Sequence, residues 1–158
     1  MTSQLKVDRI SPATGSEIII DGFGGGKILQ VVSVYFPLEA SVGPNGVLIK
    51  TAVKVSITPS SSSSRVLLHM NSGAWTASLD RALVTGFFRD NTLLVGSGGY
   101  YRSADMWGPH STSWLDSPNT TSEVTYTLGV DAEGGGVYYS GFDSTGRALQ
   151  LIAMEIGE

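Results

Sequence analysis

A stretch near residue 100 gathers the side chains best suited to binding chemistry. Five rings and one guanidinium lie there among glycine, serine and aspartate: Tyr100, Tyr101, Arg102, Trp107, His110 and Trp114. Flat rings beside planar polar groups form the usual surface for stacking on sugar faces and hydrogen-bonding their hydroxyls. The alternative is that these rings fill the core or a subunit interface, where tyrosine and tryptophan are enriched. We therefore expect residues 97–113 to form a loop that either binds a cell-surface glycan or contacts another subunit.

Carboxylates are the second group with possible chemistry. A pair drawn from Asp80, Asp90, Asp105 and Asp116 could hydrolyse a glycosidic bond if folding brought two of them together. The interpretation we favour is that they are solvated acids in loops. A serine, histidine and aspartate triad has no support from a Gly-x-Ser-x-Gly turn, which the sequence lacks. We therefore expect a protein that is not an enzyme.

The sequence does not indicate a phosphate, metal or cofactor site. The run from Gly22 to Lys27 is only superficially like a phosphate-binding loop, because Ile28 stands at the hydroxyl position and a strand should follow. The two histidines, His69 and His110, lack the paired spacing of zinc ligands, and the chain has no cysteine. We read His69 as an ordinary strand residue and expect neither metal nor cofactor.

Composition favours strands and argues against two classes of partner. Only 15% of the 158 residues are charged and 20 are glycine, which suits short strands joined by turns. Residues 1–66 carry six basic and four acidic side chains, net +2, and the rest carries four arginines and ten acids, net −6. The net negative charge of the chain from residue 67 onward has the wrong sign for binding nucleic acid or an anionic membrane. With no bilayer-length apolar run and no signal-peptide pattern, we expect a soluble, unprocessed chain without membrane insertion.

The first 26 residues read as an arm that ends in a hinge. Four glycines within residues 22–26 cannot form the centre of a strand, because each costs backbone entropy and offers nothing to pack. Before this hinge the apolar side chains have few apolar partners within the arm: Leu5, Val7, Ile10, Ile18, Ile19 and Ile20. They should pack on the main domain or on another subunit, and we favour another subunit. The predicted division is an arm and hinge over 1–26 and a head domain over 27–158.

The head reads as a series of short strands. Apolar runs and period-2 alternation predict them over 27–35, 47–57, 65–70, 83–88, 93–96, 124–130, 137–139 and 149–156. Residues 75–83 fit a helix, strand or loop equally. Residues 89–92 should turn a hairpin, with Asn91 in the left-handed conformation. The run 149–156 is apolar on both faces, as in a central strand of a two-sheet stack. The prediction is an all-β, jelly-roll-like β-sandwich.

Several segments, taken in order, resemble a family of virion proteins. They are Gly26 to Ser33, Ser56 to Ser64, Leu115 to Pro118, Tyr126 and Ile152 to Ile156, and the arm segment Leu5 to Ile10 is similar to the opening of fibre-associated segments. Together they resemble a structural module of tailed phages, many of them infecting cyanobacteria, over roughly residues 5–156. The resemblance implies a β-rich homotrimeric head on the virion, and it gives no residue roles for 97–113.

The residues and the resemblance together lead to a functional expectation. We expect a non-enzymatic virion protein, made in the host cytoplasm and displayed on the outside of the phage particle, with the arm as its anchor. The expected partners are two further copies of itself, other virion proteins of the tail or capsid and, in a receptor-binding role, a host-surface glycan. A tail-fibre or receptor-binding tip is the favoured role, a capsid decoration (cement) protein is the alternative, and a polysaccharide depolymerase is the third.

Overall fold

The computed structural model describes residues 26–36, 40–42, 47–76, 81–101, 106–133, 137–140 and 149–157. Regular structure in these ranges consists of ten β-strands, in keeping with the many valine, isoleucine and threonine residues of the chain. The strands are β1 Lys27–Phe36, β2 Ala40–Val42, β3 Ile49–Ile57, β4 Arg65–Thr76, β5 Arg81–Arg89, β6 Thr92–Tyr101, β7 Met106–Asp116, β8 Val124–Glu133, β9 Val137–Ser140 and β10 Leu149–Gly157.

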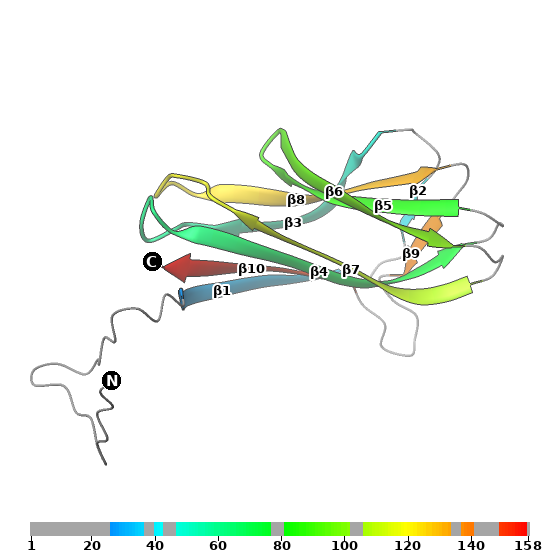
Figure 1. Cartoon of the computed structure of the whole chain (residues 1–158), viewed down its shortest axis with the longest axis horizontal. Coiled ribbons are helices and arrows are strands. Elements are labelled where there is room, and N and C mark those ends of the chain that lie inside the picture. Colours follow the sequence, from blue (N-terminus) through cyan, green and yellow to red (C-terminus); the bar gives the residue numbers. More distant parts are fainter. Residues whose placement is uncertain are drawn as a thin grey trace, which may run out of the picture.

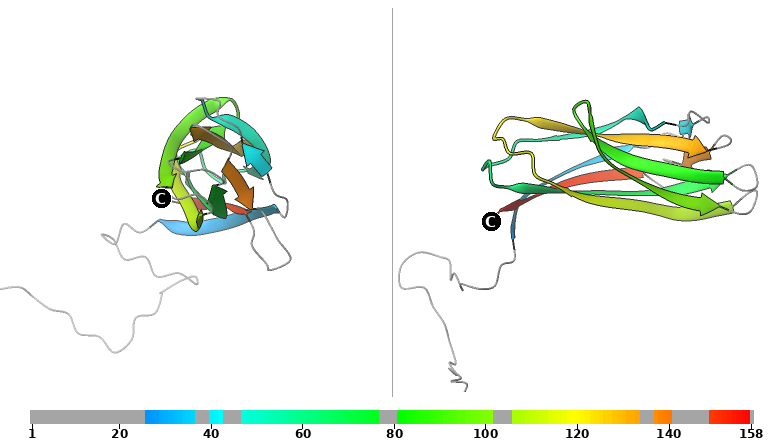
Figure 2. Two further views of the ribbon diagram at one scale, coloured as in Figure 1. Left: turned by 90° about the vertical axis from the view of Figure 1, so that its right-hand side faces the viewer. Right: turned by 45° about the horizontal axis from the view of Figure 1, so that its top comes forward.

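The strands form two antiparallel sheets that face each other (Figures 1 and 2). The first, sheet A, runs β1-β10-β4-β9-β2, with β7 also paired to β4. Strand β7 pairs with β4 from Val66 to Thr76, so β10 and β9 share the opposite edge of β4, one after the other. The second, sheet B, runs β3-β8-β5-β6. The predicted all-β, jelly-roll-like sandwich is confirmed.

Alternating side chains from both sheets fill the space between them. In β8 the predicted alternation is confirmed, because Val124, Tyr126, Leu128 and Val130 are all buried. The remaining core residues come from β3, β4, β5 and β10: Val53, Val55, Ile57, Val66, Leu68, Met70, Leu83, Phe87, Leu149, Leu151 and Ala153. Burial on this scale is the main force that holds the two sheets together.

Most predicted strands are observed, and two expectations are wrong. Residues 97–113 do not form one loop, because β6 continues to Tyr101 and β7 begins at Met106. In the β5–β6 hairpin it is Asp90, with φ of 51°, and not Asn91 that takes the left-handed conformation. The predicted strand over 65–70 continues to Thr76, and β5 begins at Arg81, so the ends of the undecided stretch 75–83 are strand.

Some expectations fall on residues outside the described part. The whole arm before Gly26 does so, including Leu5, Val7, Ile10, Ile18 and Ile20, and the division into arm and head stays a prediction. Arg102, Asp80, Asp105 and the expected turn at residues 44–46 also lie outside. Within the described ranges, no helix is long and apolar enough to cross a membrane.

Candidate functional site

The outer face of sheet A carries an apolar row that crosses four strands. Residues opposite each other in antiparallel strands point to the same side of a sheet, so the register defines each row. Val31 of β1 lies opposite Met154 of β10, which lies opposite Leu67 of β4, which lies opposite Leu115 of β7. Val31 is 58% exposed and Leu115 is 42% exposed, while the two central side chains are half-buried. An apolar row of this length on an open sheet face is typical of a surface that is covered by a partner.

The apolar character of this face falls from one end of the sheet to the other. At one end, Ile28 and Ile156 lie opposite each other. On the other side of the apolar row, Ile152 lies opposite Ser33 and His69. At the other end, the row is Tyr35, Gln150, Asn71 and Ser111, all exposed. The apolar end is therefore the end at which β1 begins and β10 finishes (Figure 1).

The chain enters the fold at this apolar end. A Cβ placed on Gly26 would fall 2.1 Å from Cγ2 of Ile156 and 2.9 Å from the backbone oxygen of Gly157. The backbone at Gly26 therefore lies directly against the side chain of Ile156, and any side chain at this position would displace it. Gly26 therefore lies at the apolar end of the outer face of sheet A.

The inner side of β7 is polar and meets β5 of the opposite sheet. The hydroxyl of Thr85 shares hydrogen bonds with Nε2 of His110, at 2.8 Å, and with the hydroxyl of Thr112, at 2.7 Å. Burial lowers the pKa of His110, because the charged imidazolium is poorly solvated there. His110 therefore acts as a neutral, buried link between the two sheets.

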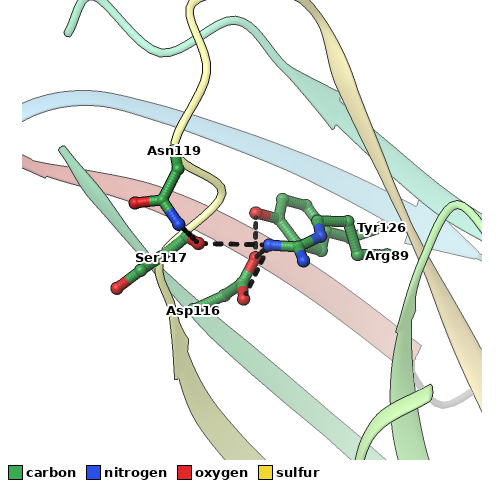
Figure 3. A network of polar contacts seen from close by, with 5 residues as sticks. All are labelled: Arg89, Asp116, Ser117, Asn119 and Tyr126. Carbon is green, nitrogen blue, oxygen red and sulfur yellow. Dashed lines mark hydrogen bonds and ion pairs between the residues drawn. The ribbon is translucent and has the colours of Figure 1, made fainter. Parts of the chain in front are cut away.

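A second link between the sheets lies at the end of β7 (Figure 3). One guanidinium nitrogen of Arg89 donates to both carboxylate oxygens of Asp116, at 3.1 and 3.0 Å, and the Tyr126 hydroxyl donates to the same carboxylate at 2.8 Å. Burial and the neighbouring Asp116 carboxylate raise the pKa of Tyr126. Arg89 also donates to the carbonyl of Ser117, as does the side-chain amide of Asn119. This network fixes the chain where it leaves β7.

A buried carboxylate holds the serine-rich loop between β3 and β4. Glu155 is fully buried on the inner side of β10, and it accepts hydrogen bonds from the amide and hydroxyl of Ser60, at 2.7 and 2.6 Å. Gln30 donates to Glu155 at 2.6 Å and to the carbonyl of Thr58 at 2.7 Å. Burial alone raises the pKa of Glu155, but hydrogen bonds from Ser60 and Gln30 outweigh it and lower the pKa to about 2. The group is therefore an ionised anchor for the loop.

The candidate binding residues do not share one surface. His110 is buried inside the sandwich, where it cannot stack on a sugar. Trp114 lies opposite Leu68 on the inner side of β7, yet it is 39% exposed because β7 is an edge strand. Tyr100 and Tyr101 lie in β6 opposite Ala82 and Arg81 of β5, and Trp107 lies opposite Trp75 of β4.

The two candidate carboxylates in the described ranges differ in their surroundings. Asp90 is exposed at the β5–β6 turn, as expected of a solvated loop acid. Asp116 is not one, because it is buried in the network with Arg89 and Tyr126. In the described ranges, no group of three or more histidine, aspartate or glutamate side chains is placed to hold a metal ion.

Sequence reasoning did not identify the outer face of sheet A. Two signals for it were present. Alternation within β1 places Val31, Ser33 and Tyr35 on one side, and the closing strand is apolar on both of its faces. The two-sided apolar closing strand predicts a central strand, and this is confirmed because β10 lies between β1 and β4. The outer face of β10 is only partly buried.

Neither a family model nor a curated protein sequence matches the chain. Its fold is similar to that of the infectious bursal disease virus VP2 subviral particle, with 11% identity and a TM-score of 0.51 over 89% of this chain and 37% of that chain. The T13 viral particle of the same virus gives 11% identity and a TM-score of 0.49, over 97% and 40% of the two chains. The Gx strain structure gives 11% and 0.48, over 92% and 42%. The chain thus spans well under half the length of these viral proteins, and the VP2 likeness concerns the fold alone.

Proposed function

We propose that this chain is a non-enzymatic structural protein of a tailed-phage virion that assembles as a homotrimer through the outer face of sheet A. The observation that carries the proposal is the apolar row from Val31 to Leu115. A folded chain that exposes such a row gains free energy by covering it, at roughly 25 cal/mol for each Å² of apolar surface removed from water. Self-association is the simplest way for a structural protein to cover it.

The similarity to a VP2 fold found in a viral particle supports this class of function. Two of the described residues that offered catalytic chemistry have structural roles, which also supports it. Asp116 is engaged by Arg89 and Tyr126, and His110 is engaged by Thr85, so both serve to link the two sheets. A depolymerase would need such groups to face a substrate.

Within the virion, the favoured role is a tail-fibre or receptor-binding tip, anchored to other virion proteins by the arm and displayed on the outside of the particle. The exposed ring of Trp114 at the open edge of β7 supports this role, because it is available to stack on a host-surface glycan. Tyr100, Tyr101, Arg102 and Trp107 remain candidates for glycan binding. Capsid decoration is the alternative role.

Adsorption and particle stability distinguish the two roles when measured on the same virions. In a tip, Trp114→Ala should remove a stacking surface of about 0.5–1.5 kcal/mol for each ring, a loss that three copies multiply through avidity. Host adsorption should then fall, whereas Leu93→Ala, which alters another exposed apolar side chain, should leave it unchanged.

In a decoration protein, adsorption should survive Trp114→Ala, and virions that lack the protein should rupture at a lower temperature, because a ligand of the assembled shell stabilises it. Virions that lack the protein but keep both normal adsorption and normal rupture temperature would contradict both roles. Imaging of intact particles with this chain labelled should place it on the tail under the first role and on the capsid under the second.

A further inference from the structure

Strand β1 leaves one edge of sheet A open. In the described part of the chain, β1 pairs with β10 and with no other strand (Figure 1). Its ten residues include no proline, so the open edge offers backbone N–H and C=O groups to a further strand.

Side chains on both faces of β1 are incompletely covered. On the outer face, Ile28 is 54% exposed and Val31 is 58% exposed. On the inner face, Val32 is only half-buried, whereas Ala153 opposite it is fully buried. One more strand at this edge would therefore bury apolar surface on both faces of the sheet.

The chain carries a suitable segment directly before β1. Ile18, Ile19 and Ile20 are β-branched residues, which favour strands, and in an extended chain they alternate between the two faces of a sheet. Residues 22–26, which read Gly-Phe-Gly-Gly-Gly, connect them to β1. Hairpin loops of about two to five residues are common, and glycine supplies the positive φ that such loops need. The segment can therefore fold back on β1 as the first strand of a hairpin.

The loop sets the register at the start of this hairpin. With residues 22–26 as the loop, Asp21 lies opposite Lys27 and Ile20 lies opposite Ile28. The first pair joins opposite charges, and the second joins two apolar side chains, and both kinds of cross-strand pair are stabilising.

The β-bulge of β1 sets the pairing beyond that point. Between Ile28 and Gln30, β10 advances by one residue while β1 advances by two. A strand on the open edge that follows the same bulge places Ile19 opposite Gln30 and Ile18 opposite Val31. Ile18 then lies on the outer face beside an exposed valine, and Ile19 points to the interior of the sandwich.

The short connection favours the segment of the same copy over any other occupant of this edge. Five extended residues span up to about 17 Å, whereas neighbouring strands are about 4.8 Å apart. A short flexible linker gives an effective concentration in the millimolar range, well above that of a second copy at about micromolar concentration.

We propose that residues 17–21 pair antiparallel with β1 of the same copy, as an additional edge strand of sheet A. The pairing adds Ile18 to the end of the apolar row and leaves the outer face of the sheet open to a partner. It holds for a single copy, so it does not depend on the proposed trimer. Residues 1–16 remain as the part of the arm that can anchor the protein.

Disulfide trapping in the full chain tests this pairing. The sequence has no cysteine, so the two introduced thiols are the only ones present. The test variant carries Ile18→Cys and Val31→Cys, which the hairpin places directly opposite each other. The control carries Ile18→Cys and Ser33→Cys, because Ser33 is also exposed on the outer face of β1, two residues further along. The unfolding temperature of each reduced variant checks that the head is folded.

The hairpin predicts that thiols 18 and 31 oxidise within one chain about tenfold faster, or more, than thiols 18 and 33. Opposite residues of antiparallel strands have Cβ atoms about 5 Å apart, whereas diagonal neighbours are about 7–8 Å apart, too far for an unstrained disulfide. An unpaired segment would close either loop with nearly equal ease, because the cost of loop closure depends weakly on length. Equal rates, or a disulfide that forms faster between chains than within one, would overturn the proposal.

Amide hydrogen exchange of the unmodified chain provides an independent test. Pairing with β1 should slow exchange at alternate residues of 17–21 by about tenfold or more relative to a free peptide of residues 12–26. Free-peptide rates throughout residues 17–21 would contradict the pairing, whatever the mass of the protein in solution.

Discussion

Arg89 of β5 and Asp116 of β7 form an ion pair that joins the two sheets of the sandwich, with one guanidinium nitrogen in contact with both carboxylate oxygens. Strand β5 belongs to sheet B and β7 to sheet A, so the pair crosses the interior at the end of β7. Its neighbours on the inner side of β7, Thr112 and His110, bond to Thr85 of the same strand β5. The contact between these two strands is therefore polar over much of its length, in contrast to the apolar cluster that β3, β4, β8 and β10 share.

The first prediction concerns this ion pair. Asp116→Ala removes the acceptor of Arg89 and of the buried Tyr126 hydroxyl, which leaves two donors without their partner. We expect the free energy of unfolding to fall by about 2–4 kcal/mol. Chemical denaturation checks this, with Ser117→Ala as control, since Ser117 contributes to the network through its backbone carbonyl. An Asp116→Ala protein as stable as the wild type would show that the network is not structural.

The second prediction is a pH dependence from Glu155. Its pKa is about 2 in the folded protein and 4.5 in the unfolded chain, so the unfolded chain binds the proton more readily. The stabilisation by the ionised carboxylate is fully present above pH 4.5, and it is lost as the pH falls from 4.5 towards 2. Glu155→Gln should lower stability at neutral pH and flatten this part of the stability curve. Thermal unfolding at several pH values checks both effects, and an unchanged slope in the variant would contradict the assignment.

The third prediction concerns a row of glycines across sheet B. Gly86 of β5 lies between Gly129 of β8 and Gly96 of β6. A Cβ on Gly86 would fall 2.2 Å from the backbone oxygen of Val95, whereas one on Gly96 would meet the end of the Leu48 side chain at 3.0 Å. Because backbone yields less than a side-chain terminus, Gly86→Ala should cost about 1–3 kcal/mol or more, and Gly96→Ala much less. Equal unfolding free energies for the two variants would refute this explanation.

The fold was predictable because its signals are local. The alternation in 124–130, the valine-rich run of β1 and the two-sided apolar closing strand each indicate a strand without reference to the rest of the chain. Strand β7 was missed because its inward positions include His110, Thr112 and Asp116, and a polar inner side removes the hydrophobic alternation that marks a half-buried strand.

The site was less predictable because it depends on pairing between distant strands. Val31 and Leu115 join one apolar row only through Met154 and Leu67, and nothing local to any of the four residues reveals that register. The anchoring role of Glu155 likewise depends on Ser60, 95 residues earlier in the chain. The aromatic cluster, in contrast, was visible in sequence as a group, but strand geometry buries His110 and leaves Trp114 partly exposed at an edge.

The most direct test of the account is the mass of the full chain in solution, measured by light scattering at micromolar concentration. We predict a particle of three times 16.6 kDa, because the apolar row on sheet A should be covered by neighbouring copies. Met154→Asp, which places a charge in the middle of that row, should shift the protein towards the mass of one chain, and Lys54→Asp on the opposite sheet should leave the trimer intact. A wild-type chain that remains at 16.6 kDa would contradict the central claim that this face drives self-assembly.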